Sequence, residues 1–253
     1  MSQILRFLSF STHTYKRYGH VMKTSIVAIF IIFCLSNVTY AQSEKLTIDC
    51  RKDFRKEDVA VLSHAPLGIK RIKKHHLRVN WVGGSRDFID KPPYDEPFQG
   101  ISYSYCGYNS TVGMHLIHKS MYSLFTGVLV DNTTGKIMPA GEYVSFSNDE
   151  KKYFAIAQED GFDGEYWYVY ARNGSLIWKG LSGISEKHPK YKYDYFVAEF
   201  HNPRWNSVGD LEANCMCSTN KKTANQRETI VTLKRVERKW VWLPMISCPR
   251  IDH

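Results

Sequence analysis

Short hydrophobic runs with a period of two recur along the chain from residue 77 onward, and they limit it to β-structure. The runs are rich in Val, Ile, Tyr, Phe and Trp and are bounded by turn residues, which is typical of half-buried strands. No window has the spacing of an amphipathic helix. We therefore predict an all-β fold, antiparallel and rich in hairpins, built as a meander that forms either a sandwich or a propeller-like assembly of sheets. The runs cover residues 77–82, 101–105, 122–130, 143–146, 153–157, 166–171, 176–179, 195–200, 229–236 and 239–243.

Turn sequences add detail to this expectation. Asn173 and Gly174 give a strong hairpin signal, because a type I′ turn needs positive φ at both central positions. The polar residues 132–135 predict a second hairpin. Residues 152–180 would supply three strands of one propeller blade, although no strict internal repeat marks a propeller. The Pro-containing stretch 83–99 and the polar stretch 218–227 predict long surface loops.

A short apolar run near the N-terminus predicts a secretory leader. Residues 26–35 are all apolar, they follow Lys23, and the mostly small or polar residues 36–41 close the run. As a helix this run would span only about 15 Å, roughly half of a bilayer's hydrocarbon core, so a cleaved signal peptide fits better than a membrane span. We expect cleavage after Ala41 and a mature chain that begins at Gln42.

The residues around the leader set the expected organisation and location. Cys34 follows the bulky Phe33, which does not suit lipoprotein processing, so we expect a soluble periplasmic product with no stable membrane span after cleavage. Met22 is either the true start, or residues 1–21 extend the leader or give a second, cytoplasmic form by alternative initiation. The expected segments are an upstream extension (1–21), a signal peptide (22–41) and a single β-rich domain (42–253).

The charge of the mature domain does not favour nucleic acid as a partner. The first 41 residues hold four of the 34 Lys and Arg residues and none of the 25 acidic residues, so the mature net charge falls from +9 to +5. The densest basic stretch, residues 70–78, alternates cationic with apolar residues. This pattern indicates a solvated strand edge or loop, and the functional alternative is a contact with an acidic protein or anionic lipid.

Five cysteines remain after cleavage, and in an oxidising compartment they favour disulfides. Cys50 with Cys106 would tie the N-terminal part to the middle of the domain. Either Cys215 or Cys217 with Cys248 would tie down the C-terminal hairpin. The odd count leaves one thiol over. The single residue between Cys215 and Cys217 does not fit a zinc or thioredoxin-type motif.

The sequence contains no complete acid–base or nucleophile constellation, and we expect neither enzymatic activity nor a cofactor or metal. Ser182 lies next to Gly180 and Gly183, whose spacing does not match a nucleophile elbow. His115 and His118 are three apart, so on a strand they face opposite sides and a structural or surface role is expected. The acidic residues 159–165 surround two glycines and are explained by a turn, by a loop that contacts a partner, or by a Ca²⁺ site without the known calcium-loop spacing.

The tryptophans favour a core role. Trp167 and Trp178 lie in neighbouring predicted strands. Trp240 and Trp242 share one strand face, so they are core residues together or form an exposed stripe suited to sugar or protein binding.

One segment, about residues 120–185, resembles a family of exported bacterial proteins. The resemblance rests on the strand-and-turn pattern of residues 127–131, 136–141, 144–147, 153–155 and 160–165. In this pattern the segment is similar to periplasmic immunity proteins of type VI secretion lipase effectors. The resemblance implies that the chain binds a toxic phospholipase from a neighbouring cell and blocks it. Such proteins are often lipid-anchored, and this chain lacks a convincing lipidation site.

An exported all-β domain with polar and basic loops suits a binding function, and two alternatives stay open. One is a secreted module that binds glycans or the envelope through exposed Trp240 and Trp242. The other is a polymer-degrading hydrolase that uses Asp160 and Asp163 as acid and base. For binding of a lipase partner, the candidate contact residues are Arg71, Lys73, Lys74, Asp160, Asp163 and Glu165.

Overall fold

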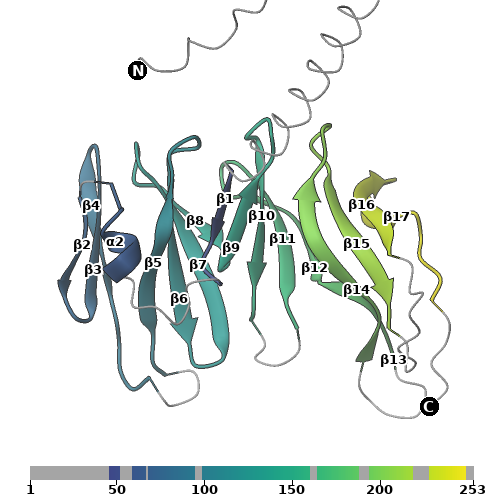
Figure 1. The fold of residues 1–253 in the computed structure, drawn as a ribbon, viewed down its shortest axis with the longest axis horizontal. Helices are drawn as coiled ribbons and strands as arrows, with labels where there is room; N and C mark the ends of the chain where they lie inside the picture. The colour runs from purple at the N-terminus through teal and green to yellow at the C-terminus, as the bar shows by residue number, and fades with distance from the viewer. Residues whose placement is uncertain are drawn as a thin grey trace, which may run out of the picture. The chain divides into compact units, whose positions relative to one another are not determined.

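The predicted β-strands pair into four antiparallel sheets (Figure 1). The structure is a computed structural model that describes residues 46–51, 59–66, 68–94, 99–159, 164–187, 194–218 and 228–248. The predicted extension and leader, Asp160, Asp163 and residues 219–227 lie outside the described residues. Residues 45–253 form one compact unit. The prediction of an all-β, antiparallel, hairpin-rich fold is confirmed.

Each sheet is a meander of strands that follow one another in the chain, with β1 as the exception because it crosses to pair with β9. The helix α2 (Val59–Leu62) is a single turn. The first sheet contains β2 (Ile69–Lys73), β3 (His76–Trp81) and β4 (Gly84–Ile89); the second contains β5 (Ser102–Asn109), β6 (Met114–Met121), β7 (Leu124–Asp131) and β8 (Ile137–Ala140); the third contains β1 (Thr47–Asp49), β9 (Tyr143–Phe146), β10 (Lys152–Ala157), β11 (Tyr166–Ala171) and β12 (Leu176–Leu181); the fourth contains β13 (Gly183–Lys187), β14 (Asp194–Trp205), β15 (Leu211–Cys217), β16 (Thr229–Val236) and β17 (Lys239–Leu243).

The sheets pack face to face in chain order, with one hydrophobic core between each successive pair. Leu77 and Val79 of the first sheet meet Ile117 and Val130 of the second. The next two cores lie between the second and third sheets and between the third and fourth. Burial of each large apolar side chain contributes about 1.5–3 kcal/mol. This packing explains why the inner strands are apolar on both faces while the outer strands alternate.

Strand β10 shows the double-sided packing most clearly. Tyr153 and Ala155 belong to the core shared with the second sheet, while Phe154 and Ile156 belong to the core shared with the fourth. Strands β10, β11 and β12 are consecutive in the third sheet, as predicted for the three strands within residues 152–180.

One predicted loop is wrong in part, and the hairpin predicted at Asn173 and Gly174 is confirmed between β11 and β12 but with another turn type. Residues 84–89 of the predicted loop 83–99 form β4, which pairs with β3 along its whole length; the prolines that suggested a loop begin only at residue 92. The turn after β11 has positive φ at Gly174 but not at Asn173. Hydrogen bonds from Gly174 N to Ala171 O (2.9 Å) and from Ala171 N to Ser175 O (2.8 Å) close a three-residue loop instead of a type I′ turn.

The basic segment 70–78 forms the β2–β3 hairpin, and β2 is an edge strand. The prediction of a strand edge is therefore confirmed. The sequence did not indicate β6, because its apolar residues are interrupted by His115 and His118.

Candidate functional site

A cavity of about 500 Å³ opens where the third and fourth sheets meet. Most of the lining residues belong to β9, β10, β11 and β14 or lie next to them, and one, Arg51, follows β1. The lining residues are Arg51, Tyr143, Ile156, Glu165, Trp167, Phe200, His201, Asn202, Pro203 and Arg204. They come from three parts of the chain, residue 51, residues 143–167 and residues 200–204, and the sheet packing brings them together.

The floor of the cavity is the apolar core between the two sheets. Ile156, Trp167 and Phe200 are buried there, and the ring centroids of Trp167 and Phe200 lie 5.9 Å apart. The indole Nε1 of Trp167 donates to Glu165 Oε2 at 3.4 Å. This contact connects the floor to a charged residue of the rim.

Arg51 forms one side of the rim. Its guanidinium donates from Nε and Nη2 to the two carboxylate oxygens of Asp49, at 3.2 and 3.4 Å, and lies over the ring of Tyr143 at 4.5 Å. Its Nη1 is 3.9 Å from Glu165 Oε1. Burial alone would lower the pKa of Arg51, but the hydrogen bond with Asp49 and the charges of Asp49 and Glu165 raise it.

A β-bulge in β14 forms the opposite side. His201 pairs with Asn214 and Arg204 pairs with Glu212, so Asn202 and Pro203 stand opposite one residue of β15. Asn202 has a φ of 51°, a conformation that asparagine tolerates better than most residues. Proline has no N–H for the ladder, which suits a bulge. Bulges re-aim side chains, and here all four residues from His201 to Arg204 line the cavity.

No family model, curated protein or solved structure matches this chain. The binding properties of the cavity are therefore inferred from its lining residues. Its lining combines two guanidinium groups, one carboxylate, one imidazole and three aromatic rings. Aromatic residues and Arg are the types that carry most binding energy at protein interfaces, and the cavity volume lies in the range of preformed ligand sites, roughly 300–1,000 Å³.

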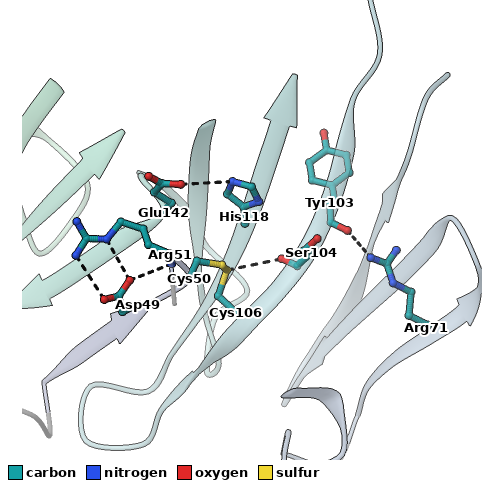
Figure 2. Close-up of a disulfide and its surroundings, with 9 residues drawn as sticks. All are labelled: Asp49, Cys50, Arg51, Arg71, Tyr103, Ser104, Cys106, His118 and Glu142. Atoms are coloured by element: carbon teal, nitrogen blue, oxygen red, sulfur yellow. Dashed lines mark hydrogen bonds and ion pairs between the residues drawn. A yellow bond between two sulfur atoms is a disulfide. The ribbon is translucent and has the colours of Figure 1, made fainter. Parts of the chain in front are cut away.

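A disulfide holds the segment that carries Arg51. Cys50 is bonded to Cys106, which joins the residue after β1 to β5 and so links the third sheet to the second (Figure 2). A second disulfide joins Cys217 of β15 to Cys248. Both are among the pairings that the sequence left open, and Cys215 remains a buried thiol whose pKa is raised by burial. Two disulfides indicate folding in an oxidising, extracellular or periplasmic environment.

The candidate contact residues from the sequence are not gathered in one place. Glu165 lies at the cavity rim. Arg71 in β2 is partly buried: it donates to Tyr103 O of β5 (Figure 2) and its Nη1 is 3.8 Å from Asp90. Lys73 and Lys74 are exposed at the end of the β2–β3 hairpin. Arg71 thus holds the first sheet against the second, a role that the sequence did not indicate.

The two histidines of β6 are buried on opposite faces of the second sheet, as predicted. His115 lies between Tyr105, whose hydroxyl donates to Nδ1 at 3.1 Å, and Asn132, whose Oδ1 accepts from Nε2 at 3.0 Å. Burial lowers the pKa of His115. His118 lies near Glu142 on the other face.

Two further observations concern the described residues as a set. Among them, no group of three or more His, Cys, Asp or Glu side chains could hold a metal ion. In the same part of the chain, no helix has the length and apolar composition needed to cross a membrane.

Sequence reasoning missed most of the cavity. Arg51, Tyr143 and the residues from His201 to Arg204 were not among the predicted contacts. One local signal was available, since Asn202-Pro203 interrupts an otherwise strand-like run, and a proline inside such a run indicates an edge or a bulge. The contribution of Arg51 depends on β1 crossing to β9, which no local pattern reveals.

Proposed function

We propose that this chain is an exported immunity protein, which binds a cognate antibacterial lipase or phospholipase effector of a type VI secretion system and neutralises it in the periplasm. It acts by binding, without turnover. The leader at residues 22–41 delivers it, and the effector's active site is blocked in the complex. The two disulfides and the resemblance of residues 120–185 support this function.

The observation that carries the proposal is the composition of the cavity. Arg51, Arg204 and Trp167 stand in a preformed hollow whose charged groups are partly removed from water. Such groups bind strongly when a partner completes their contacts. Glu165 belongs both to the cavity rim and to the segment that carries the resemblance.

The test is co-expression with the product of an adjacent lipase-like gene. The full chain should abolish toxicity of the effector directed to the periplasm, and the two proteins should co-elute as a stable complex. A chain without residues 1–41 should fold poorly in the cytosol and give no protection. Persistent toxicity together with separate elution of the two purified proteins would refute the proposal.

Packing around Trp242 weighs against the glycan-binding alternative. That function required Trp240 and Trp242 to be exposed, whereas Trp242 lies 4.7 Å from Phe200 and 5.7 Å from Trp178 between ring centroids. The hydrolase alternative rested on Asp160 and Asp163, which lie outside the described residues.

A further inference from the structure

Three donor–acceptor pairs around the cavity are close enough to attract but too far apart to hydrogen-bond directly. Arg51 Nη1 and Glu165 Oε1 are 3.9 Å apart, Arg204 Nε and Glu212 Oε2 are 3.8 Å apart, and His201 Nε2 and Glu199 Oε2 are 3.7 Å apart. A direct N–H···O bond needs about 2.7–3.2 Å. Each pair therefore keeps capacity to bond a third group.

His201 is the clearest case. Its side chain is 39% exposed, yet its Nε2 atom is buried and has no hydrogen-bond partner within the described part of the chain. A buried polar atom without a hydrogen bond destabilises the protein, because it has lost its bonds to water. An incoming ligand that supplies the bond would recover this free energy.

A neutral group with both a donor and an acceptor fits such pairs best. A peptide group supplies one N–H and one C=O, so the carbonyl can accept from Arg51 while an N–H donates to Glu165. A charged ligand fits less well, because each positive group on the walls already faces a carboxylate. Sugar hydroxyls also combine donor and acceptor. The exposure of the aromatic residues in the cavity floor distinguishes a peptide ligand from a sugar.

The aromatic floor favours a peptide over a sugar. Trp167 is 1% exposed and Phe200 is 4% exposed, so neither presents an open ring face on which a sugar could stack. The guanidinium of Arg51 lies over the ring of Tyr143. The exposed lining of the cavity is mainly polar, so a partner segment contacts it chiefly through hydrogen bonds.

We infer that this cavity receives a loop of the protein partner, with main-chain amides of the loop bonded to Arg51, Glu165 and His201. The inference rests on the proposed function and names the part of the partner that the site recognises. The bulge at Asn202 and Pro203 shapes the wall along which the loop lies.

Single substitutions in the cavity test this inference, with the purified effector as the probe. Glu165→Ala and His201→Ala should each raise the Kd for the effector at least tenfold. Glu186→Ala, on the exposed part of β13, is the matched control and should change the Kd less than twofold. Thermal melting and near-UV circular dichroism should show that all three variants fold as the parent does.

The outcomes separate the inference from the proposed function. If the parent chain binds the effector and both cavity variants bind within twofold of it, the cavity is not the contact and the inference is wrong, while the proposed function stands. If the parent chain neither binds nor protects, the proposed function itself fails.

Two further measurements cover a sugar ligand and a misfolded variant. If millimolar chitotriose displaces the effector from the parent chain, the cavity binds a sugar and the peptide assignment is wrong. Should a variant fail to fold, amide hydrogen exchange of the parent complex decides, since residues 199–206 should become protected on binding. Unchanged exchange there would overturn the inference.

Discussion

Glu142 and His118 face each other between the second and third sheets, with Oε2 and Nε2 4.0 Å apart (Figure 2). The side chain of Glu142 is 14% exposed and that of His118 is 4% exposed. Burial raises the pKa of Glu142 to about 7, against the opposing charge of Arg51. Burial lowers the pKa of His118 to about 4. Both side chains are therefore neutral in the folded protein between these two values.

The Glu142–His118 pair gives opposing pH dependences of stability. For Glu142, the folded form keeps a proton that the unfolded form releases near its ordinary pKa of 4.5, so stability is lost as the pH rises from about 4.5 to 7. For His118, the unfolded form takes up a proton below its ordinary pKa of 6.5, so stability is lost as the pH falls from about 6.5 to 4. Between about pH 4.5 and 6.5 the two effects on stability have opposite signs and largely cancel.

Replacing one residue of the pair should reveal the pH dependence of stability that the other contributes. In Glu142→Gln the loss with rising pH disappears, so the free energy of unfolding at pH 8 minus that at pH 5 should increase by about 1–3 kcal/mol relative to the parent chain. Urea denaturation at the two pH values measures this difference. Glu186→Gln on exposed β13 is the control and should leave the difference unchanged. An unchanged difference in Glu142→Gln would mean that Glu142 is already ionised at pH 5.

Arg71 should matter for stability even though it resembles a surface cation in the sequence. Its Nη1 faces Asp90, whose side chain is only 7% exposed and whose Oδ1 accepts from Tyr103 N at 2.8 Å. Arg71→Met removes the cation and leaves Asp90 buried, which should cost about 2–4 kcal/mol. Lys73→Met, at the exposed end of the same strand, should change stability by less than about 0.5 kcal/mol. Equal midpoints in urea for the two variants would contradict this role.

The sequence predicts the strands better than it predicts which residues the strands bring together in the cavity. Continuous apolar runs identified β10 and β11, because both faces of these strands are buried. Strand β4 was hidden, since its exposed residues Gly84 to Asp87 give no apolar alternation. The cavity depends on long-range pairing: Arg51 reaches it through β1, and Glu165 through the packing of β11 against the fourth sheet. Local periodicity holds no information on such contacts.

The Cys50–Cys106 disulfide should matter for binding as well as for stability. Its 56-residue separation predicts a loss of about 2–4 kcal/mol in the double variant Cys50→Ser/Cys106→Ser. The variant also releases the end of β1 and with it Arg51, so effector binding should weaken. Removing Cys217–Cys248, separated by 31 residues, should lower stability to a similar degree and leave Arg51 in place. If both double variants bind the effector equally, the position of Arg51 does not depend on the first disulfide.

Two glycines of the segment that carries the family resemblance mark a close approach of main chains. A Cβ at Gly141, in the passage from β8 to β9, would lie 1.6 Å from Ile156 O, and one at Gly127 would lie 2.3 Å from Gly141 O. Backbone atoms on both sides leave no room for a side chain. Close packing of the main chains therefore explains why glycine occupies these two positions. Their presence in the segment that carries the resemblance needs no contact with a partner to explain it.

Gly141→Ala should for this reason be strongly destabilising. The added methyl group must push β9 away from β10 and stretch the hydrogen bond from Glu142 N to Ile156 O, which is 2.9 Å long. We expect a loss of about 2–4 kcal/mol, at or above the usual range for overpacking. Gly83→Ala is the control, because a Cβ there would meet only Trp81 Nε1 at 3.8 Å, and it should change stability by less than about 0.5 kcal/mol. A Gly141→Ala variant that melts with the parent would show that β9 and β10 can separate at this point without cost.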